Sequence, residues 1–420
     1  MLAAMGEPCA APGGAARRER GALAALRHRP FALVWSAALV SSIGTWMQAL
    51  AAPYQLFELT HSNTWLGIAS GASMLPALAL MPLAGVLADR LSRRRIILAT
   101  QLVQVAVALA LFALARAAWL SPGLLVGLLA VAGAASGLQL ASWQSFVPLL
   151  LPPQLLADGV RLNTLQFTAS RALGPALAGG VLAAFGVATA FLLNAVSFVL
   201  VFLAVAASRP REAQVRVWSG VARDVAEGFR YTRGNPTLWI AVLTAFAVAF
   251  FGHSVGQVAA GLAKQVFAVG PSGLGAMTAS IGAGAMSGSV LIALFPDRHR
   301  RSSLAQTGLF SYALGIAGVA LAPVLFAALP AFFLMGLSHV AVMMSVNTAL
   351  QTRVPEPLRG RVISIHLAAL FAGLPAGALS LGRLGDAFGL RAALGVSAAL
   401  LFGYACVAWW RFRRLSVLDR

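Results

Sequence analysis

The chain is 420 residues long, with 59% hydrophobic and only 10% charged residues. Soluble domains carry about 25% charged residues, so this composition excludes a soluble globular protein and indicates a chain that crosses a membrane many times. The net charge of +19 would suggest nucleic-acid binding in a soluble protein. Here the basic residues are spread over short segments between apolar runs, which favours membrane topology as the cause and predicts no nucleic-acid partner.

A basic tail, 1–30, comes first; it lacks the apolar core of a signal peptide and is expected to be disordered. Twelve apolar runs follow, each about the 20 residues that a helix needs to cross a bilayer. Neighbouring runs are hard to divide, so eleven or thirteen spans remain open. The expected spans are Phe31–Glu58, Trp65–Ala88, Arg95–Ala115, Gly123–Val147, Asn163–Phe185, Ala188–Ala207, Thr237–Leu262, Gly273–Phe295, Ser303–Ala322, Phe326–Leu350, Val362–Gly385 and Ala392–Trp410.

The segment Gly85–Arg95, after the second run, sets the orientation of the chain. Asp89 and four arginines lie within seven residues there, and such a cluster belongs in water rather than lipid. The positive-inside rule places it in the cytoplasm. With that orientation, the cytoplasmic loops and both tails hold 26 of the 31 Lys and Arg residues. We therefore expect a multi-pass protein of the cell inner (cytoplasmic) membrane with both termini in the cytoplasm.

A polar stretch, 208–236, divides the spans six and six. It contains apolar residues at helical spacing, which is typical of an amphipathic helix on the membrane surface; a partly helical linker is the equal alternative. These apolar residues are Trp218, Val221, Val225 and Phe229.

The two sets of spans also look duplicated. Pro152–Gly186 and Pro355–Gly389 begin and end alike about half a chain apart, as expected for parallel repeats. The sequence thus predicts a six-helix bundle at 31–207, a linker at 208–236, a second six-helix bundle at 237–411 and a cytoplasmic tail at 412–420.

Five stretches spread over nearly the whole chain carry a family pattern. They are GTWMQ (Gly44–Gln48), FELTHS (Phe57–Ser62), LPALALMPLAGVLADRLSRRR (Leu75–Arg95), GPALAGG (Gly174–Gly180) and LQTRVPEPLRGRVISI (Leu350–Ile365). In these stretches the chain resembles the major facilitator superfamily. More closely, it resembles the bacterial efflux branch of macrolide-efflux and enterobactin-exporter-like proteins, also called transmembrane secretion effectors.

The resemblance implies an all-α membrane protein with twelve transmembrane helices in two pseudo-symmetric six-helix bundles. It also implies a gating motif in which Asp89 holds the two halves together in the outward-facing state; for Asp89 and its arginines, a purely topological role is the alternative. The gating residues would be Gly85, Asp89, Arg90, Arg93 and Arg94. The fourth span has no arginine where many proton-coupled drug exporters have one, so the resemblance supports efflux more than proton antiport.

Polar residues inside spans are the candidates for a substrate cavity, because such groups are costly in lipid and usually face the bundle interior. In the resembling family, spans 1, 4, 7 and 10 line that cavity. The candidates are Thr45, Trp46, Gln48, Gln55, Gln139, Trp143, Arg171, His253, Gln257, His339 and Asn347. Hydrogen bonding between helices is the alternative for the polar stripe of span 1. Arg171 could attract an anionic substrate group or pair with a helix C-terminus.

The acidic residues lie away from the centres of the spans. A proton-driven antiporter needs a group that titrates as the cavity changes sides, and histidine titrates near neutral pH. The coupling candidates are therefore Glu58, His253 and His339. Neither histidine has a second ligand at metal spacing, so no metal site is expected.

The resemblance implies a secondary exporter of drug-like compounds or secreted metabolites such as siderophores, working by alternating access and coupled to protons. An importer, or a non-transporting sensor or lipid-translocating relative, remains open. An ATP-driven pump is excluded within this chain because Lys264, its one lysine, is followed by Gln265 rather than the Ser or Thr of a phosphate-binding loop. No enzymatic motif or cofactor site is expected. The expected partners are a small-molecule substrate, protons and membrane lipids, and the expected state is a monomer.

Overall fold

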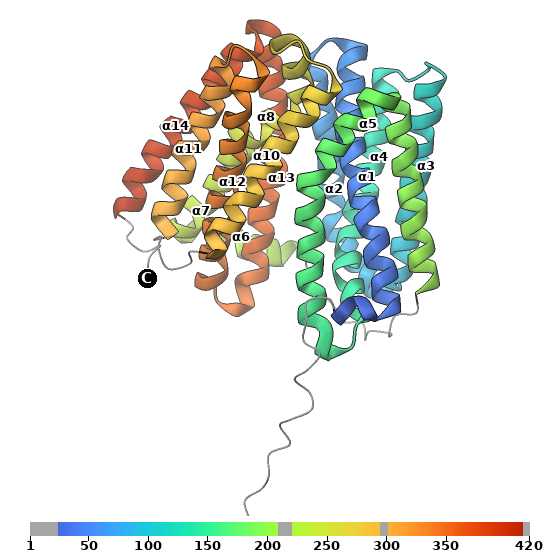
Figure 1. Cartoon of the computed structure of the whole chain (residues 1–420). Helices are drawn as coiled ribbons and strands as arrows, with labels where there is room; N and C mark the ends of the chain where they lie inside the picture. Colours follow the sequence, from blue (N-terminus) through green and yellow to red (C-terminus); the bar gives the residue numbers. More distant parts are fainter. Residues whose placement is uncertain (1–23, 209–220, 295–300, 415–420) are drawn as a thin grey trace, which may run out of the picture.

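A computed structural model describes residues 24–208, 221–294 and 301–414, and these ranges are helical with short turns. Two bundles of long helices lie side by side, one from each half of the sequence (Figure 1). The predictions for the tails beyond these ranges and for most of the linker, Trp218 included, lie outside the described residues. So do the side chains of Asp89 and Arg90 and the surroundings of Gly85 in the expected gating motif.

The described part of the first half contains five long helices. They are α1 (Arg29–Thr60), α2 (Asn63–Arg90), α3 (Arg93–Arg116), α4 (Pro122–Phe146) and α5 (Leu156–Ala207), with short 3₁₀ turns at Ala24–Arg27, Val147–Leu150 and Pro153–Leu155. Helix α5 holds two expected spans, because Gly186 breaks it with a φ of 79°. Glycine adopts this left-handed conformation without steric cost, so the chain turns there and recrosses the bundle.

The second half begins with α6 (Val221–Gly234) and continues to α14. The other elements are α7 (Pro236–Ala247), the π-helical η4 (Val248–His253), α8 (Ser254–Gln257), α9 (Ala259–Gly261), the π-helical η5 (Leu262–Val266), α10 (Pro271–Leu294), α11 (Arg301–Leu321), α12 (Leu325–Arg353), α13 (Glu356–Phe388) and α14 (Leu390–Arg414). The expected seventh span, Thr237–Leu262, is therefore not one regular helix. The π-helical η4 and a break at Val258 interrupt it, and the π-helical η5 begins at its last residue.

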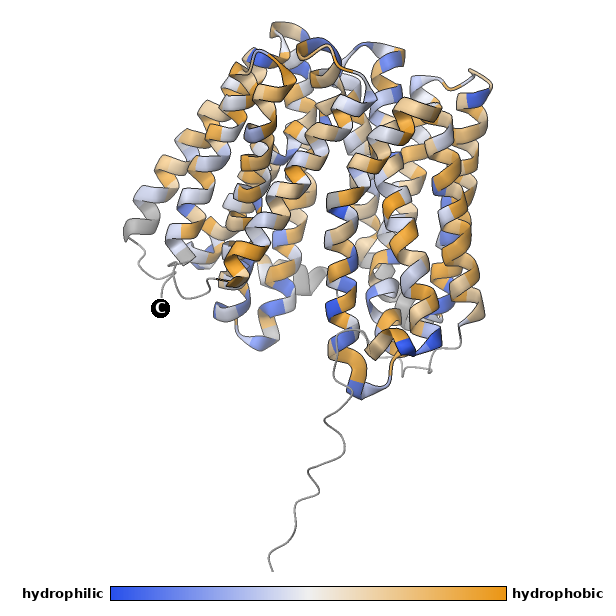
Figure 2. Ribbon diagram, in the orientation of Figure 1, coloured by the Kyte–Doolittle hydropathy of each residue, from blue (hydrophilic) through white to orange (hydrophobic). Residues whose placement is uncertain are grey.

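Eleven helices in the described ranges are long and apolar enough to cross a membrane. One of them, Pro153–Ala207, is the 55-residue segment that Gly186 divides, so the described residues form the twelve spans that the apolar runs predict. Apolar residues recur along the length of these helices (Figure 2). Large side chains such as Leu321 and Phe326 are 81% and 84% exposed, as expected where lipid rather than water surrounds the bundle.

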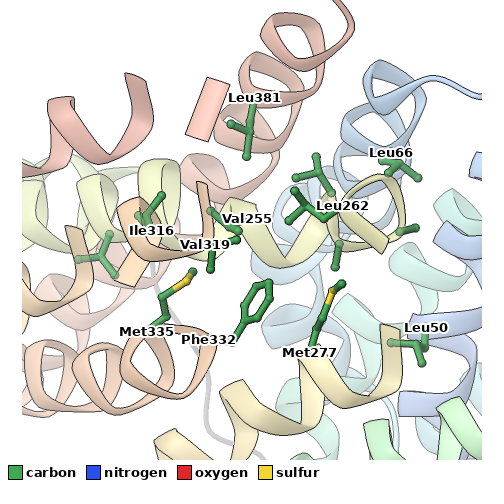
Figure 3. Close-up of a cluster of buried hydrophobic side chains, with 14 of the residues drawn as sticks. Leu50, Leu66, Val255, Leu262, Met277, Ile316, Val319, Phe332, Met335 and Leu381 are labelled. Carbon is green, nitrogen blue, oxygen red and sulfur yellow. The ribbon is translucent and has the colours of Figure 1, made fainter. Parts of the chain in front are cut away.

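The buried apolar core joins the two halves at one end. We name the two ends by their turns: the α1–α2 end and the α2–α3 end. Leu50 and Leu66 of the first half lie in one cluster with Leu262, Met277 and Leu381 of the second half (Figure 3). These residues come from the last turns of α1, the start of α2 and the elements that face them. At the α1–α2 end the halves are thus packed together.

A separate apolar cluster lies in the first half toward the α2–α3 end. It includes Phe31 at the start of α1, Ile97 at the start of α3, Phe146 at the end of α4 and Val205 at the end of α5. The described residues of this cluster all come from the first half. At this end the first half therefore has an apolar cluster of its own, separate from the cluster that joins the halves.

The linker is helical from Val221 to Gly234, and this helix packs on the second half. Glu227 forms an ion pair with Arg361 of α13 at 2.7 Å, and the Phe229 ring meets the Trp239 ring edge to face at 5.8 Å. Phe229 remains 44% exposed. This exposed apolar side chain fits a helix on the membrane surface as well as a linker packed on the second half.

Candidate substrate cavities and the contacts between the halves

A polar cavity of about 560 Å³ lies within the first half. Helices α1 to α5 supply most of its wall, while Gln257 and Phe371 reach it from the second half. Six amide side chains of the described residues line it from the first half, which is costly in a membrane unless they bond each other, water or a ligand. They are Gln48, Gln101, Gln104, Gln139, Gln166 and Asn194.

Several of these amides bond across helices. Asn194 donates to Gln48 at 2.8 Å, joining α5 to α1, and Gln104 donates to Ser136 at 2.8 Å, joining α3 to α4. Within the polar stripe of α1, Gln48 therefore bonds α5 and lines the cavity at the same time.

A smaller cavity of about 170 Å³ lies between the two halves. Trp46 and Arg171 reach it from the first half, and His253 and Tyr312 from the second. Its wall shares Ala49, Pro53 and Gln257 with the larger cavity. The two cavities therefore adjoin beside the middle of α1.

A histidine pair stands at the second-half side of the smaller cavity. The rings of His253 and His339 are 5.0 Å apart between centroids, and Tyr312 meets His339 edge to face at 6.2 Å. His253 is the last residue of the π-helical η4. Such π segments are frequent at functional sites because the extra residue re-aims side chains.

Most of the predicted cavity residues line one of the two cavities. Thr45, Gln48, Gln139 and Trp143 line the larger one, Trp46, Arg171 and His253 the smaller one, and Gln257 both. Three others are not part of either wall: Gln55, His339, which packs on His253, and the exposed Asn347, which accepts a hydrogen bond from Gln351.

Several wall residues were not predicted. Gln101 and Gln104 lie one turn apart on α3, and Gln166 and Asn194 lie on the two arms of α5. These four are polar residues inside apolar spans, which is the same signal that predicted the other wall residues. Tyr312 of α11 is another missed residue.

Asp386, at the end of α13, binds the first turn of α2 across the interface between the halves. Its carboxylate accepts hydrogen bonds from the backbone N–H groups of Asn63 and Thr64 at 2.7 and 2.9 Å, and from the Ser62 hydroxyl at 2.6 Å. The first N–H groups of a helix have no partner within the helix. The second half thus supplies the N-terminal cap of α2, and we call this arrangement the Asp386 latch.

An ion pair lies at the same end. Lys264 donates to Glu58 at 2.5 Å and stands 5.0 Å from the centre of the Tyr54 ring. The hydrogen bond to the Glu58 carboxylate raises the pKa of Lys264. Both partners are more than a third exposed, so the pair contributes roughly 0–1 kcal/mol. Glu58, one of the coupling candidates, is placed here rather than in a cavity wall.

At the α2–α3 end, Arg94 binds within its own half. Its guanidinium donates to the backbone oxygens of Val205, at 3.1 Å, and Ala206. These carbonyls belong to the last turn of α5, where a cation is favourable. In this arrangement Arg94 caps α5 and fixes the start of α3 against it.

Comparison with known proteins gives one consistent result. The family model described as "Transmembrane secretion effector" matches residues 20–419. The "Multidrug efflux pump Tap" of Mycobacterium tuberculosis is 27% identical over 391 residues, covering 86% of this chain and 88% of the relative. The "Macrolide efflux protein A" of Streptococcus pyogenes is 24% identical over 383 residues, covering 90% and 94%.

Solved structures show the same fold. A bacterial homologue of the human lysosomal transporter Spinster, described as inward-facing and unoccupied, aligns with a TM-score of 0.72 at 17% identity over 94% of this chain and 98% of that one. The nucleoside transporter NupG aligns with a TM-score of 0.71 at 14% identity, covering 91% of this chain and 99% of that one. The expected twelve-helix architecture is confirmed, and the family is one of transporters rather than enzymes. The chain belongs to the transmembrane secretion effector family of the major facilitator superfamily.

Proposed function

We propose that this transporter exports small molecules across the cytoplasmic membrane by alternating access. The observation that carries the proposal is the pair of adjoining cavities, both of which are lined by residues of both halves. Movement of the halves about that boundary would open the cavities to one side of the membrane and then to the other. The relatives named as efflux pumps support the outward direction.

The orientation follows from charge. If the arginine-rich α2–α3 end faces the cytoplasm, the Asp386 latch and the packing of the halves at the α1–α2 end lie at the outer side. The halves are then joined outside the cavities, which is the arrangement of an inward-facing state. Substrate would enter from the cytoplasm, and release would require the latch to open.

We assign proton coupling to the pair of His253 and His339. The two rings are adjacent, and His253 lines the cavity that both halves share, so a change of state would alter the access of this pair to water. Replacing His253 with Gln should abolish accumulation driven by a pH gradient while counterflow of substrate continues. The matched control is His366→Gln, a buried histidine of α13 that is not part of either cavity wall; equal loss in both variants would contradict the assignment.

Export itself is tested by susceptibility of a host without its own pumps, with and without this protein, across antibiotics and siderophores. We expect resistance to at least one compound and its accumulation in everted membrane vesicles. Accumulation in right-side-out vesicles instead would indicate an importer. Movement of lipid in reconstituted vesicles without counterflow of any solute would indicate a lipid-translocating protein.

A further inference from the structure

Arg171 is a cation in the wall of the smaller cavity without a bonding partner among the described residues. It lies on α5, well inside the membrane span, and is partly buried. Within the described ranges, its guanidinium makes no hydrogen bond or ion pair. A charge held in this way is costly, because its lost hydration is not replaced by a counter-ion. The cost is offset if a ligand supplies the negative charge.

The surroundings of Arg171 favour an anion over a cation. The residues that line the two cavities include no carboxylate in the described part of the chain. Beside Arg171, the wall offers the Tyr312 hydroxyl, the Gln257 amide and the His253 ring, which can donate hydrogen bonds to a negatively charged oxygen. A cationic ligand would meet Arg171 with no opposite charge to offset the repulsion.

The position of Arg171 connects such a ligand to both halves. Arg171 and Trp46 belong to the first half, whereas His253 and Tyr312 belong to the second. The adjoining larger cavity, with its amide wall, has room for the uncharged polar remainder of the ligand. Trp46 adds an aromatic face for a planar group.

We propose that the substrates of this transporter are organic anions, whose negatively charged group binds Arg171 between the two halves. The uncharged body of the ligand extends past Gln257 into the larger cavity. This assignment of the substrate class rests on the proposed function, but binding of the anion can be measured without transport.

The test is equilibrium dialysis with purified protein in lipid nanodiscs. The probes share one aromatic body and differ in charge: 2-naphthoate, the neutral 2-naphthamide and the cationic 2-naphthylmethylammonium. We expect naphthoate to bind at least about tenfold more tightly than the other two, since hydrogen bonds to charged groups are the stronger ones. Arg171→Gln should abolish this preference, and Arg171→Lys should retain part of it. Arg383→Gln, which removes an exposed arginine of α13 outside both cavities, should leave it unchanged.

Three outcomes overturn the proposal: equal or tighter binding of the cation, a preference that survives in Arg171→Gln, and no binding of naphthoate. If vesicles carrying the protein exchange a cationic drug while naphthoate does not bind, export stands and the anion site fails. If naphthoate binds through Arg171 but no solute crosses the vesicle membrane, the site stands and the proposed export fails.

Discussion

Asp386→Ala is expected to shift the protein toward the state in which the α1–α2 end is open, by about tenfold in the equilibrium constant. The carboxylate binds two backbone N–H groups and the Ser62 hydroxyl from the other half. Hydrogen bonds to a charged group contribute about 1.5–3 kcal/mol, and about 1.4 kcal/mol is a factor of ten. Because Asp386 is exposed, we expect the lower end of that range.

The shift can be measured as a distance across the α1–α2 end. Spin labels on Trp119→Cys and Phe326→Cys, in a background without Cys9 and Cys406, report from exposed positions of the two halves. The long-distance population should grow in Asp386→Ala and, to a smaller extent, in Asp386→Asn, which keeps an acceptor but no charge. Arg383→Gln, on the same helix, is the control. An unchanged distance distribution in both Asp386 variants would show that the latch does not hold the halves together.

The lengths of the apolar runs and the charges between them predict much of this fold. A bilayer sets the length of a spanning helix, and basic segments between spans indicate the cytoplasmic side. The expected first span, Phe31–Glu58, lies within α1 (Arg29–Thr60), and the division expected between Phe185 and Ala188 falls at Gly186. The irregular seventh span could not be predicted in this way. A π-helical turn changes the hydrogen-bond register but not the hydropathy of the chain.

The sequence predicts those residues of the candidate site that are polar or charged within an apolar span. Arg171 and His253 are polar groups inside apolar runs, and each lines a cavity. The Asp386 latch depends instead on residues more than 320 positions apart. On its own, a carboxylate near the end of a span does not differ from an ordinary surface charge, so the pairing follows only from the packing of the two halves.

Helices α10 and α12 pack closely at two glycines, and replacing one of them is expected to lower the stability of the protein strongly. A Cβ added at Gly284 would lie 1.9 Å from the backbone oxygen of Phe333, and one added at Gly336 would lie 1.9 Å from that of Ile281. Helices in membranes associate through such small residues, which allow their backbones to approach. The opposing atoms are backbone atoms, so relief requires the two helices to move apart.

Gly284→Val should therefore destabilise the second half by about 1–3 kcal/mol or more, which is the usual cost of overpacking. The matched control is Gly403→Val on α14, where an added Cβ would meet no atom within 4 Å. Both variants replace glycine with the same β-branched residue in a helix, so the difference between them isolates the close contact. Thermal unfolding in detergent, followed by tryptophan fluorescence, should show a lower midpoint for Gly284→Val alone. A midpoint equal to that of Gly403→Val would mean that α10 and α12 can separate without loss of stability.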